Sequence, residues 1–263
     1  MANEEQLAIL KQGVDVWNQW RVENPDVEID LSGTEFKKDN LRHVNLHKAN
    51  LENTNLSVVN LFEANLIQAN LKEADLTEAN LLGANLTRAD LRLATLMEAD
   101  LGFADLNHTD LSRADIATTR FVSAIFHNTI FVDSLFGLTV LGDNDLSTCL
   151  GLETVKHSSS STIGIDTIQK SKGKIPVRFL RGCGLSDLDI AYAKLAAPGL
   201  DQEQVALITY EIHRLYCDEP IQFYSCFISY NNKDEAFAQR LHDDLQNSGV
   251  RCWFAPEDMK IGD

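Results

Sequence analysis

A five-residue period runs through the first half of the chain and limits what it can fold into. Every fifth residue from Leu31 to Leu146, 24 positions in all, is Leu, Ile or Phe. A second column two residues earlier is almost all alanine from Ala49 to Ala124. On a helix these residues would spread over every face, and on a flat strand they would alternate sides. The chain must therefore turn once per repeat.

This period predicts a solenoid. Two inward residues spaced by two make a very short strand, and the polar residues that follow make a corner, so each pentapeptide is one side of a coiled tube. Spacing alone leaves the number of sides per coil open. An Asn or Asp lies between the apolar columns from Asn40 to Asp115, except at Thr95. We interpret this polar column as structural, bonding to the corners of adjacent coils.

The repeats resemble a known family. AlaAsnLeuThrArg at 84–88 and AlaAspLeuAsnHis at 104–108 are similar to the units of pentapeptide-repeat proteins. The resemblance implies a mainly β fold, a right-handed quadrilateral parallel β-helix with four sides per coil. On that basis the repeats over residues 26–150 make about six coils.

The N-terminal residues 1–25 are predicted to form one capping helix over the first coil. Asn3 is a suitable N-cap, and Pro25 follows the predicted end of the helix. Such a helix would bury the open end of the tube and block edge-to-edge pairing. The alternative is a partner-binding helix with Trp17 and Trp20 as its anchors.

The five-residue register fails after Leu146. The Ser-rich tract at 158–162 is typical of a linker, so residues 151–220 are predicted to be a linker with short helices.

Exposed positions of the tube can be compared because residues 20 apart should stack. Phe62, Leu82 and Val122 share one column, with Phe103 beside it. A contiguous apolar patch often marks an interface, so we predict contact with another copy, the N-terminal helix or the later domain. Charged columns mix signs, which disfavours the duplex-mimicking, topoisomerase-binding role known for some members of the family.

Composition excludes several functional classes. The net charge of −16 disfavours nucleic-acid binding, which needs clustered Lys and Arg. No apolar run reaches membrane-spanning length, and no export signal is evident, so a soluble cytoplasmic protein is expected. Five scattered cysteines without Cys-x-x-Cys spacing indicate reduced thiols and no metal site.

The last 43 residues, 221–263, carry a second pattern. A β-branched and aromatic run at 223–230, an amphipathic segment at 234–247 and a short apolar run at 250–254 predict strand, helix and strand. This order suggests a parallel α/β sheet.

These residues resemble the opening of a bacterial Toll/interleukin-1 receptor (TIR) domain, which is flavodoxin-like. PheIleSerTyr at 227–230, CysTrpPhe at 252–254 and ProGluAspMetLysIleGlyAsp at 256–263 carry the resemblance. It implies self-assembly for signalling or cleavage of the glycosidic bond of NAD+. Part of a nucleotide pocket would come from Ser229, Tyr230, Trp253 and Phe254. An interaction loop would come from Pro256, Glu257, Asp258 and Gly262.

No catalytic residue is assigned. In the family, NAD+ cleavage depends on a glutamate of a later helix, beyond Asp263, so we expect a gene fragment, a split product or a recombinant piece. The preferred function is a non-catalytic scaffold that binds protein partners, without cofactor, nucleic acid or membrane. NAD+ glycohydrolase activity of a completed TIR domain and topoisomerase inhibition by duplex mimicry are the alternatives.

Overall fold

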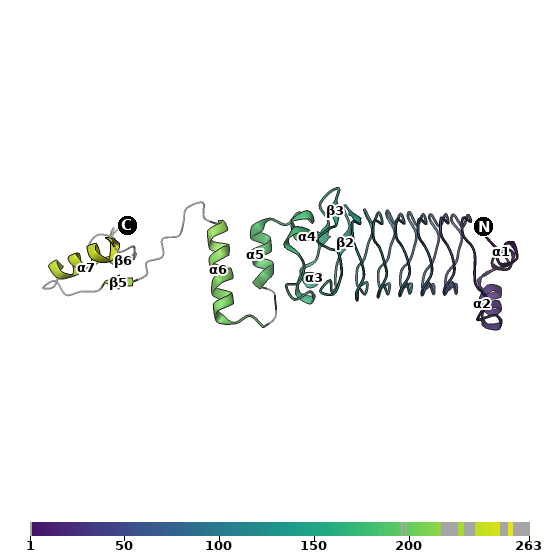
Figure 1. Cartoon of the computed structure of the whole chain (residues 1–263), viewed down its shortest axis with the longest axis horizontal. Helices are drawn as coiled ribbons and strands as arrows, with labels where there is room; N and C mark the ends of the chain where they lie inside the picture. Colours follow the sequence, from purple (N-terminus) through teal and green to yellow (C-terminus); the bar gives the residue numbers. More distant parts are fainter. Residues whose placement is uncertain are drawn as a thin grey trace. The chain divides into compact units, whose positions relative to one another are not determined.

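The computed structural model of the chain describes residues 2–195, 197, 199–216, 226–228, 235–247 and 252–254. The chain divides into two compact units, Met1–Ile212 and His213–Asp263. The first unit contains a regular tube with helices at both ends (Figure 1). Among the described residues, no helix has both the length and the hydropathy that crossing a membrane requires.

Each coil of the tube takes 20 residues. Parallel bridges join Asn50 to Asn70 and Asn70 to Asp90, and the same offset recurs along the repeats. With five residues per side, a coil therefore has the four sides that were expected. We number the walls by the central residue of their first side: Leu31 for the first, Phe36 for the second, Leu41 for the third and Leu46 for the fourth.

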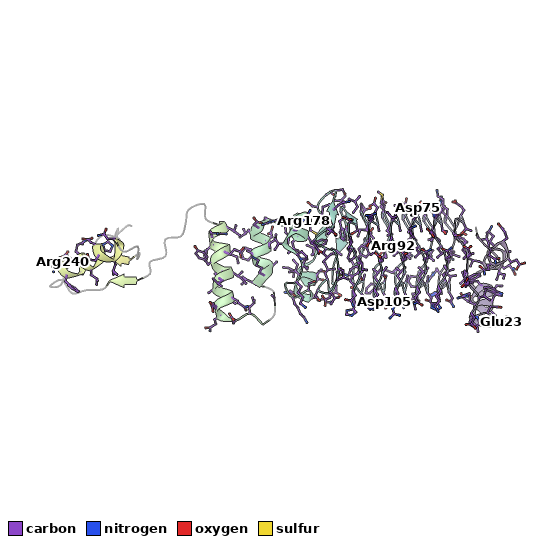
Figure 2. All side chains as sticks on the ribbon, in the orientation of Figure 1. Glu23, Asp75, Arg92, Asp105, Arg178 and Arg240 are labelled. Atoms are coloured by element: carbon purple, nitrogen blue, oxygen red, sulfur yellow. The ribbon has the colours of Figure 1, made fainter. Side chains whose placement is uncertain are left out.

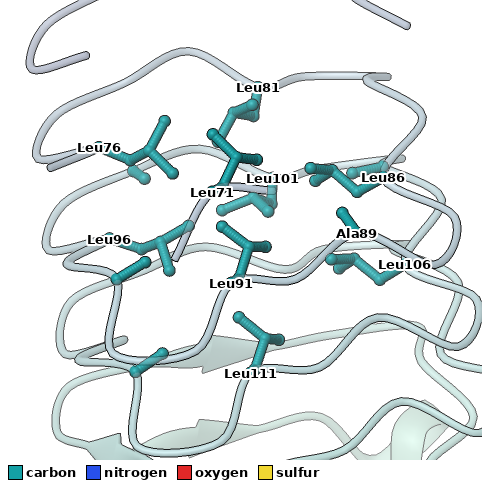
Figure 3. Packing of buried hydrophobic residues seen from close by; sticks show 14 of the residues in the cluster. Leu71, Leu76, Leu81, Leu86, Ala89, Leu91, Leu96, Leu101, Leu106 and Leu111 are labelled. Carbon is teal, nitrogen blue, oxygen red and sulfur yellow. The ribbon is translucent and has the colours of Figure 1, made fainter. Parts of the chain in front are cut away.

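Both apolar columns point into the tube, as predicted. Leu86, Leu91, Leu96 and Leu101 are all 0% exposed, and Ala89 is 1% exposed. Central leucines stack along all four walls (Figure 3). Near the end of the repeats, four phenylalanines on successive sides extend this stack with ring centroids 5.3, 5.5 and 5.7 Å apart. Burial of this continuous column is the main source of stability.

In the repeat at 50–54, every backbone N–H group has a partner. Three of these groups bond to neighbouring coils, one closes the corner and one bonds to the Asn side chain. The five bonds run from Asn50 N to Ile29 O (2.8 Å), Leu51 N to Asn70 O (2.7 Å), Asn53 N to Lys72 O (3.0 Å), Thr54 N to Leu51 O (3.2 Å) and Glu52 N to Asn50 Oδ1 (3.2 Å).

The Asn and Asp column is therefore structural, as interpreted, but its main bond lies within its own coil. Asn50 Oδ1 accepts from Glu52 N–H, an Asx turn that satisfies a donor at the corner. A bond between coils is added in places, as from Asn70 Nδ2 to Asn50 Oδ1 at 3.0 Å.

A residue with left-handed backbone makes each regular corner. The second residue after a central position has φ of 57° at Asn53, 59° at Val58 and 68° at Gly83. A type II turn requires this conformation at its third residue, and the Thr54 N–H to Leu51 O bond closes such a turn. Most of these corners carry neither Gly nor Asn, so the sequence gives little sign of them.

The strand on each side of the tube is shorter than predicted. Most sides contribute a single bridging residue, and strands of two residues appear only near the end of the repeats, at β1 (Leu135–Phe136) and β2 (Val140–Leu141). The corners leave so few extended residues on a side that the ladder cannot lengthen.

The N-terminal cap consists of two helices, so the single helix predicted within residues 1–25 is wrong. The helices are α1 (Glu4–Leu10) and α2 (Val14–Glu23). Gly13 separates them with φ of 125°, a conformation that L side chains rarely adopt. Asn3 caps α1 as predicted, accepting from two backbone N–H groups at 3.0 and 3.2 Å.

Side chains of these helices pair with the open backbone edge of the first coil. Asn18 donates to His43 O at 2.9 Å and accepts from Asn45 N–H at 2.8 Å. The indole N–H of Trp17 donates to Asn45 O at 2.8 Å, and Gln6 makes two further bonds to the backbone at Glu28 and Asp30. The predicted capping role is confirmed. Because Trp17 is 0% exposed, it cannot be a surface anchor for a partner.

An irregular coil continues the tube where a Ser-rich linker was predicted. β3 (Lys156–His157) pairs with β1, and β4 (Thr162–Ile163) pairs with β2, both in parallel. The pairing offset grows to 21 residues at Leu135 and 22 at Val140, so the tract at 158–161 spans a longer corner. The extra residues end the five-residue period but leave the pairing intact, which is why the linker interpretation was wrong.

Helices close the C-terminal end of the tube. α3 (Ile165–Lys170) and α4 (Val177–Gly182) bury Ile168 and Phe179 in the tube core. Phe179 meets Phe136 edge to face with centroids 5.3 Å apart, which continues the phenylalanine stack. α5 (Asp187–Leu195) packs on both helices, and α6 (Gln202–Tyr216) follows it.

The second unit contains the predicted strand, helix and strand. β5 (Cys226–Ile228) and β6 (Cys252–Phe254) are parallel, with Phe227 opposite Trp253, and α7 (Glu235–Asn247) lies between them in sequence. This connection is the parallel crossover expected from the sequence.

Candidate interaction surfaces

The third wall carries the predicted apolar patch. Phe62, Leu82 and Val122 are half-buried, whereas Phe103 is 65% exposed. Phe103 occupies a corner with φ of 56°, so its ring projects from the tube.

Contacts within the column account for the partial burial. The guanidinium carbon of Arg42 lies 4.7 Å from the centroid of the Phe62 ring, and His43 meets the same ring edge to face. A Cβ atom at Gly102 would lie 2.9 Å from Leu82 Cδ1, so this glycine makes the space that the Leu82 side chain fills. The column thus packs largely on itself, and its interface role stays a prediction.

The first wall carries a ladder of ion pairs. Lys72 Nζ lies 3.1 Å from Glu52 Oε1, and Arg92 lies 2.6 Å from Asp90 Oδ2. The hydrogen bond from Lys72 lowers the pKa of Glu52 and raises that of Lys72. Surface pairs of this kind contribute little to stability, so they mainly neutralise the wall.

Most of the predicted nucleotide-pocket and loop residues lie outside the described part of the chain. These are Ser229, Tyr230, Pro256, Glu257, Asp258 and Gly262. Trp253 and Phe254 lie on β6, opposite Phe227 and Ile228 of β5. The pocket and the interaction loop therefore stay predictions.

The helix of the second unit has one buried and one exposed face. α7 contacts β6 and buries Ala238 and His242, at 2% and 8% exposure. Phe237 is 63% exposed and Leu241 is 38% exposed. These two residues lie one turn apart, so they form an apolar pair on the exposed surface of the helix.

Two groups in the C-terminal cap, the partly buried His157 ring and the buried Cys183 thiol, were not singled out as sites. His157 lies between Phe136 and Phe179, with ring centroids 5.9 and 5.4 Å away, and neither of its nitrogens has a hydrogen-bond partner. Desolvation lowers the pKa of His157. Burial raises the pKa of the Cys183 thiol to about 12, so this cysteine is an unreactive core residue. Periodicity could not reveal either environment.

Over the described ranges, no three His, Cys, Asp or Glu side chains lie close enough together to hold a metal ion.

Comparison with protein families gives two matches. Pentapeptide repeats match in eight copies over residues 28–57, 59–92 and 94–133, and a TIR domain matches over residues 226–263. Comparison of the chain with curated proteins gives no match.

Several solved structures are similar to parts of the chain. Rfr23, a pentapeptide repeat protein of the cyanobacterium Cyanothece 51142, is 20% identical with a TM-score of 0.37, over 56% of this chain and 97% of its own. HetL of Nostoc sp. strain PCC 7120, involved in heterocyst differentiation regulation, is 24% identical with a TM-score of 0.24, over 52% and 71%. Trypsin-treated QnrB1, a plasmid-mediated fluoroquinolone resistance protein, is 14% identical with a TM-score of 0.22, over 72% and 97%.

Proposed function

We propose that this chain, which contains pentapeptide repeats and matches a TIR domain over its last residues, is a non-catalytic interaction scaffold of a signalling protein. Repeat solenoids present extended binding surfaces, and the tube here is closed at both ends by side chains that pair with its backbone edges. Closed ends leave the four walls as the surfaces available to partners.

The exposed pair on α7 carries the proposal for the TIR-matched unit. Phe237 and Leu241 keep large apolar areas in contact with water, although Ala238 and His242 on the neighbouring face of the same helix are buried. Exposed apolar groups that cluster are typical of binding surfaces. We infer that this pair contacts another TIR domain.

Binding to a separately purified bacterial TIR domain tests this proposal. The full chain would be labelled and titrated with that domain, with fluorescence anisotropy as the readout. A Phe237→Glu/Leu241→Glu variant should bind at least about tenfold more weakly, because charges would replace the buried apolar contact. Leu93→Glu, at an exposed apolar position of the first wall, is the matched control and should bind normally.

Absence of binding by the native chain, or equal binding by the double variant, would refute the proposal. NAD+ cleavage is the enzymatic alternative that the TIR match implies. Release of nicotinamide from NAD+ by the purified full chain, above that of a heat-denatured control, would overturn the non-catalytic assignment. Inhibition of a topoisomerase in a supercoiling assay would favour the duplex-mimicking alternative.

A further inference from the structure

The second and fourth walls of the tube face opposite directions. Leu76 and Leu96 of the second wall lie across the core from Leu86 and Leu106 of the fourth wall (Figure 3). Among the outward side chains, Asp75 lies at one edge of the tube in Figure 2 and Asp105 at the other. Charges on these two walls therefore act on different neighbours.

The second wall is acidic. Asp75, Glu78, Glu98 and Asp115 occupy three successive coils, and from the second coil onward its sides at 55–58, 75–78, 95–98, 115–118 and 135–138 contain no Lys or Arg. Glu78 and Glu98 are exposed corner residues. None of these four carboxylates forms an ion pair with a described residue.

The fourth wall has the opposite character near the N-terminal end. Lys48 and Arg88 are exposed corner residues, and the first three sides of this wall, 45–48, 65–68 and 85–88, contain no Asp or Glu. Neither cation pairs with an acid within the described ranges. On a chain with net charge −16, this wall is a local exception.

The cations of the fourth wall and the carboxylates of the second wall have the same spacing along the tube. Lys48 and Arg88 are two coils apart, and so are Asp75 and Asp115, which is roughly 10 Å at the usual strand separation. Asp75 comes 27 residues after Lys48, and Asp115 comes 27 residues after Arg88, which at 20 residues per coil is about one and a third coils. If a second tube is shifted along the first by that distance, Lys48 meets the level of Asp75 and Arg88 meets the level of Asp115. One stagger therefore aligns both pairs.

Exposed apolar side chains accompany the charges. Val58 and Met97 on the second wall are each 38% exposed, and Ile125 on the fourth wall is 51% exposed. Two such walls can bury apolar area between them while the charges set the register.

We propose that copies of this chain associate side by side, with the second wall of one copy against the fourth wall of the next. The two surfaces differ, so the contact is heterologous and can repeat into rows. Rows would raise the local concentration of the TIR-matched units. This inference goes beyond the proposed function and needs only the tube.

Charge reversal on each wall tests the association. Sedimentation velocity of the full chain, at increasing protein concentration in about 0.1 M NaCl, would measure it, because a Debye length near 10 Å screens the distant like charges but not contacting pairs. The average sedimentation coefficient of native protein should increase with protein concentration. Glu78→Lys/Glu98→Lys and Lys48→Glu/Arg88→Glu should each stay monomeric, because two like walls then meet.

An equimolar mixture of these two variants should associate more than either variant alone, because the lysines introduced on the second wall of one copy attract the glutamates introduced on the fourth wall of the next. It should associate less than native protein, because Asp75 and Asp115, which accept backbone N–H bonds, stay in place. Glu5→Lys/Glu153→Lys changes the net charge as Glu78→Lys/Glu98→Lys does, but outside both walls, and should behave as native. Glu78→Gln/Glu98→Gln provides a milder variant and should associate more weakly than native protein. A native chain that stays monomeric, or a mixture no heavier than its components, would refute the proposal. The TIR-binding assay is independent of this result.

Discussion

The corner residue of each five-residue repeat has a special backbone conformation. Each corner needs positive φ, yet Val58 occupies one at 59° although its β-branched side chain is poorly suited to it. Left-handed backbone costs an L-residue about 1–2 kcal/mol. The Val58 N–H group donates to Thr77 O at 2.8 Å, and such bonds between coils offset this cost.

Replacing Val58 with Asn should stabilise the protein by about 1 kcal/mol, because Asn tolerates left-handed backbone and the Val58 side chain is already 38% exposed. Guanidinium denaturation followed by circular dichroism would measure the free energy of unfolding. Asn53→Val, at a corner with φ of 57°, is the reciprocal control and should destabilise by a similar amount. If both changes are neutral, corner strain is not a determinant of stability.

Capping elements at both ends satisfy backbone groups of the end coil with side chains. Asn18 and Trp17 of α2 do so at the first coil, and Thr167 and Ser171 do so at the C-terminal end, where Phe179 of α4 adds aromatic contacts with the core. His157 joins that aromatic contact, with both nitrogens out of reach of solvent and acceptors. The C-terminal cap is therefore the end whose stability should respond to pH.

Acid should loosen this cap through His157. Its pKa is lowered in the folded protein, so the unfolded chain binds the proton more readily. Stability is therefore full above the ordinary pKa of about 6.5 and is lost as pH falls below it. The hollow beside the ring is lined by Lys156, Arg178 and Asp133. The two cations disfavour protonation of His157, and the Asp133 carboxylate offsets their effect only in part.

Thermal unfolding at pH 7.5 and pH 5.0 would measure this effect. His157→Phe should keep the aromatic packing and show a smaller loss of melting temperature on acidification than the native chain. His47→Phe is the matched control, and its melting temperature should fall on acidification by as much as that of the native chain. An unchanged pH response in the His157 variant would contradict the assignment.

Across the whole first unit, stability depends on stacking between neighbouring coils. Leu86 lies between Leu66 and Leu106 of the fourth wall, because bridges join Asn65 to Asn85 and Asn85 to Asp105, and all three leucines are 0% exposed. In a solenoid each repeat contacts only its neighbours, so a defect acts through the coils on either side. Regular hydrogen bonds hold those coils at a set spacing, which prevents collapse into a cavity.

Leu86→Ala should therefore destabilise the protein by about 2–5 kcal/mol, since both the apolar transfer term and a cavity term apply. Equilibrium denaturation should show a lower midpoint with the same slope. Met97→Ala, at an exposed position of the tube, should stay within about 0.5 kcal/mol of native. A similar loss in both variants would mean that the core does not dominate stability.

Much of the fold follows from periodicity, because the five-residue period by itself determines which side chains of a repeat face the core and which face solvent. The inward columns at Leu86 and Ala89, the capping function of Asn3 and the parallel strand, helix and strand around α7 were all predictable on local grounds. The family matches over residues 28–133 and 226–263 agree with the same patterns.

Pairings between distant segments were decided only by the tertiary structure. No local sequence signal pairs Asn18 with Asn45, and none assigns the tract at 158–161 to a seventh, longer coil. Both contacts depend on which residues of successive coils lie at the same height along the tube. Likewise, a five-residue period specifies which side chains point outward. Only closure of the coil after 20 residues places Glu78 and Arg88 on opposite walls, where they can act on different partners.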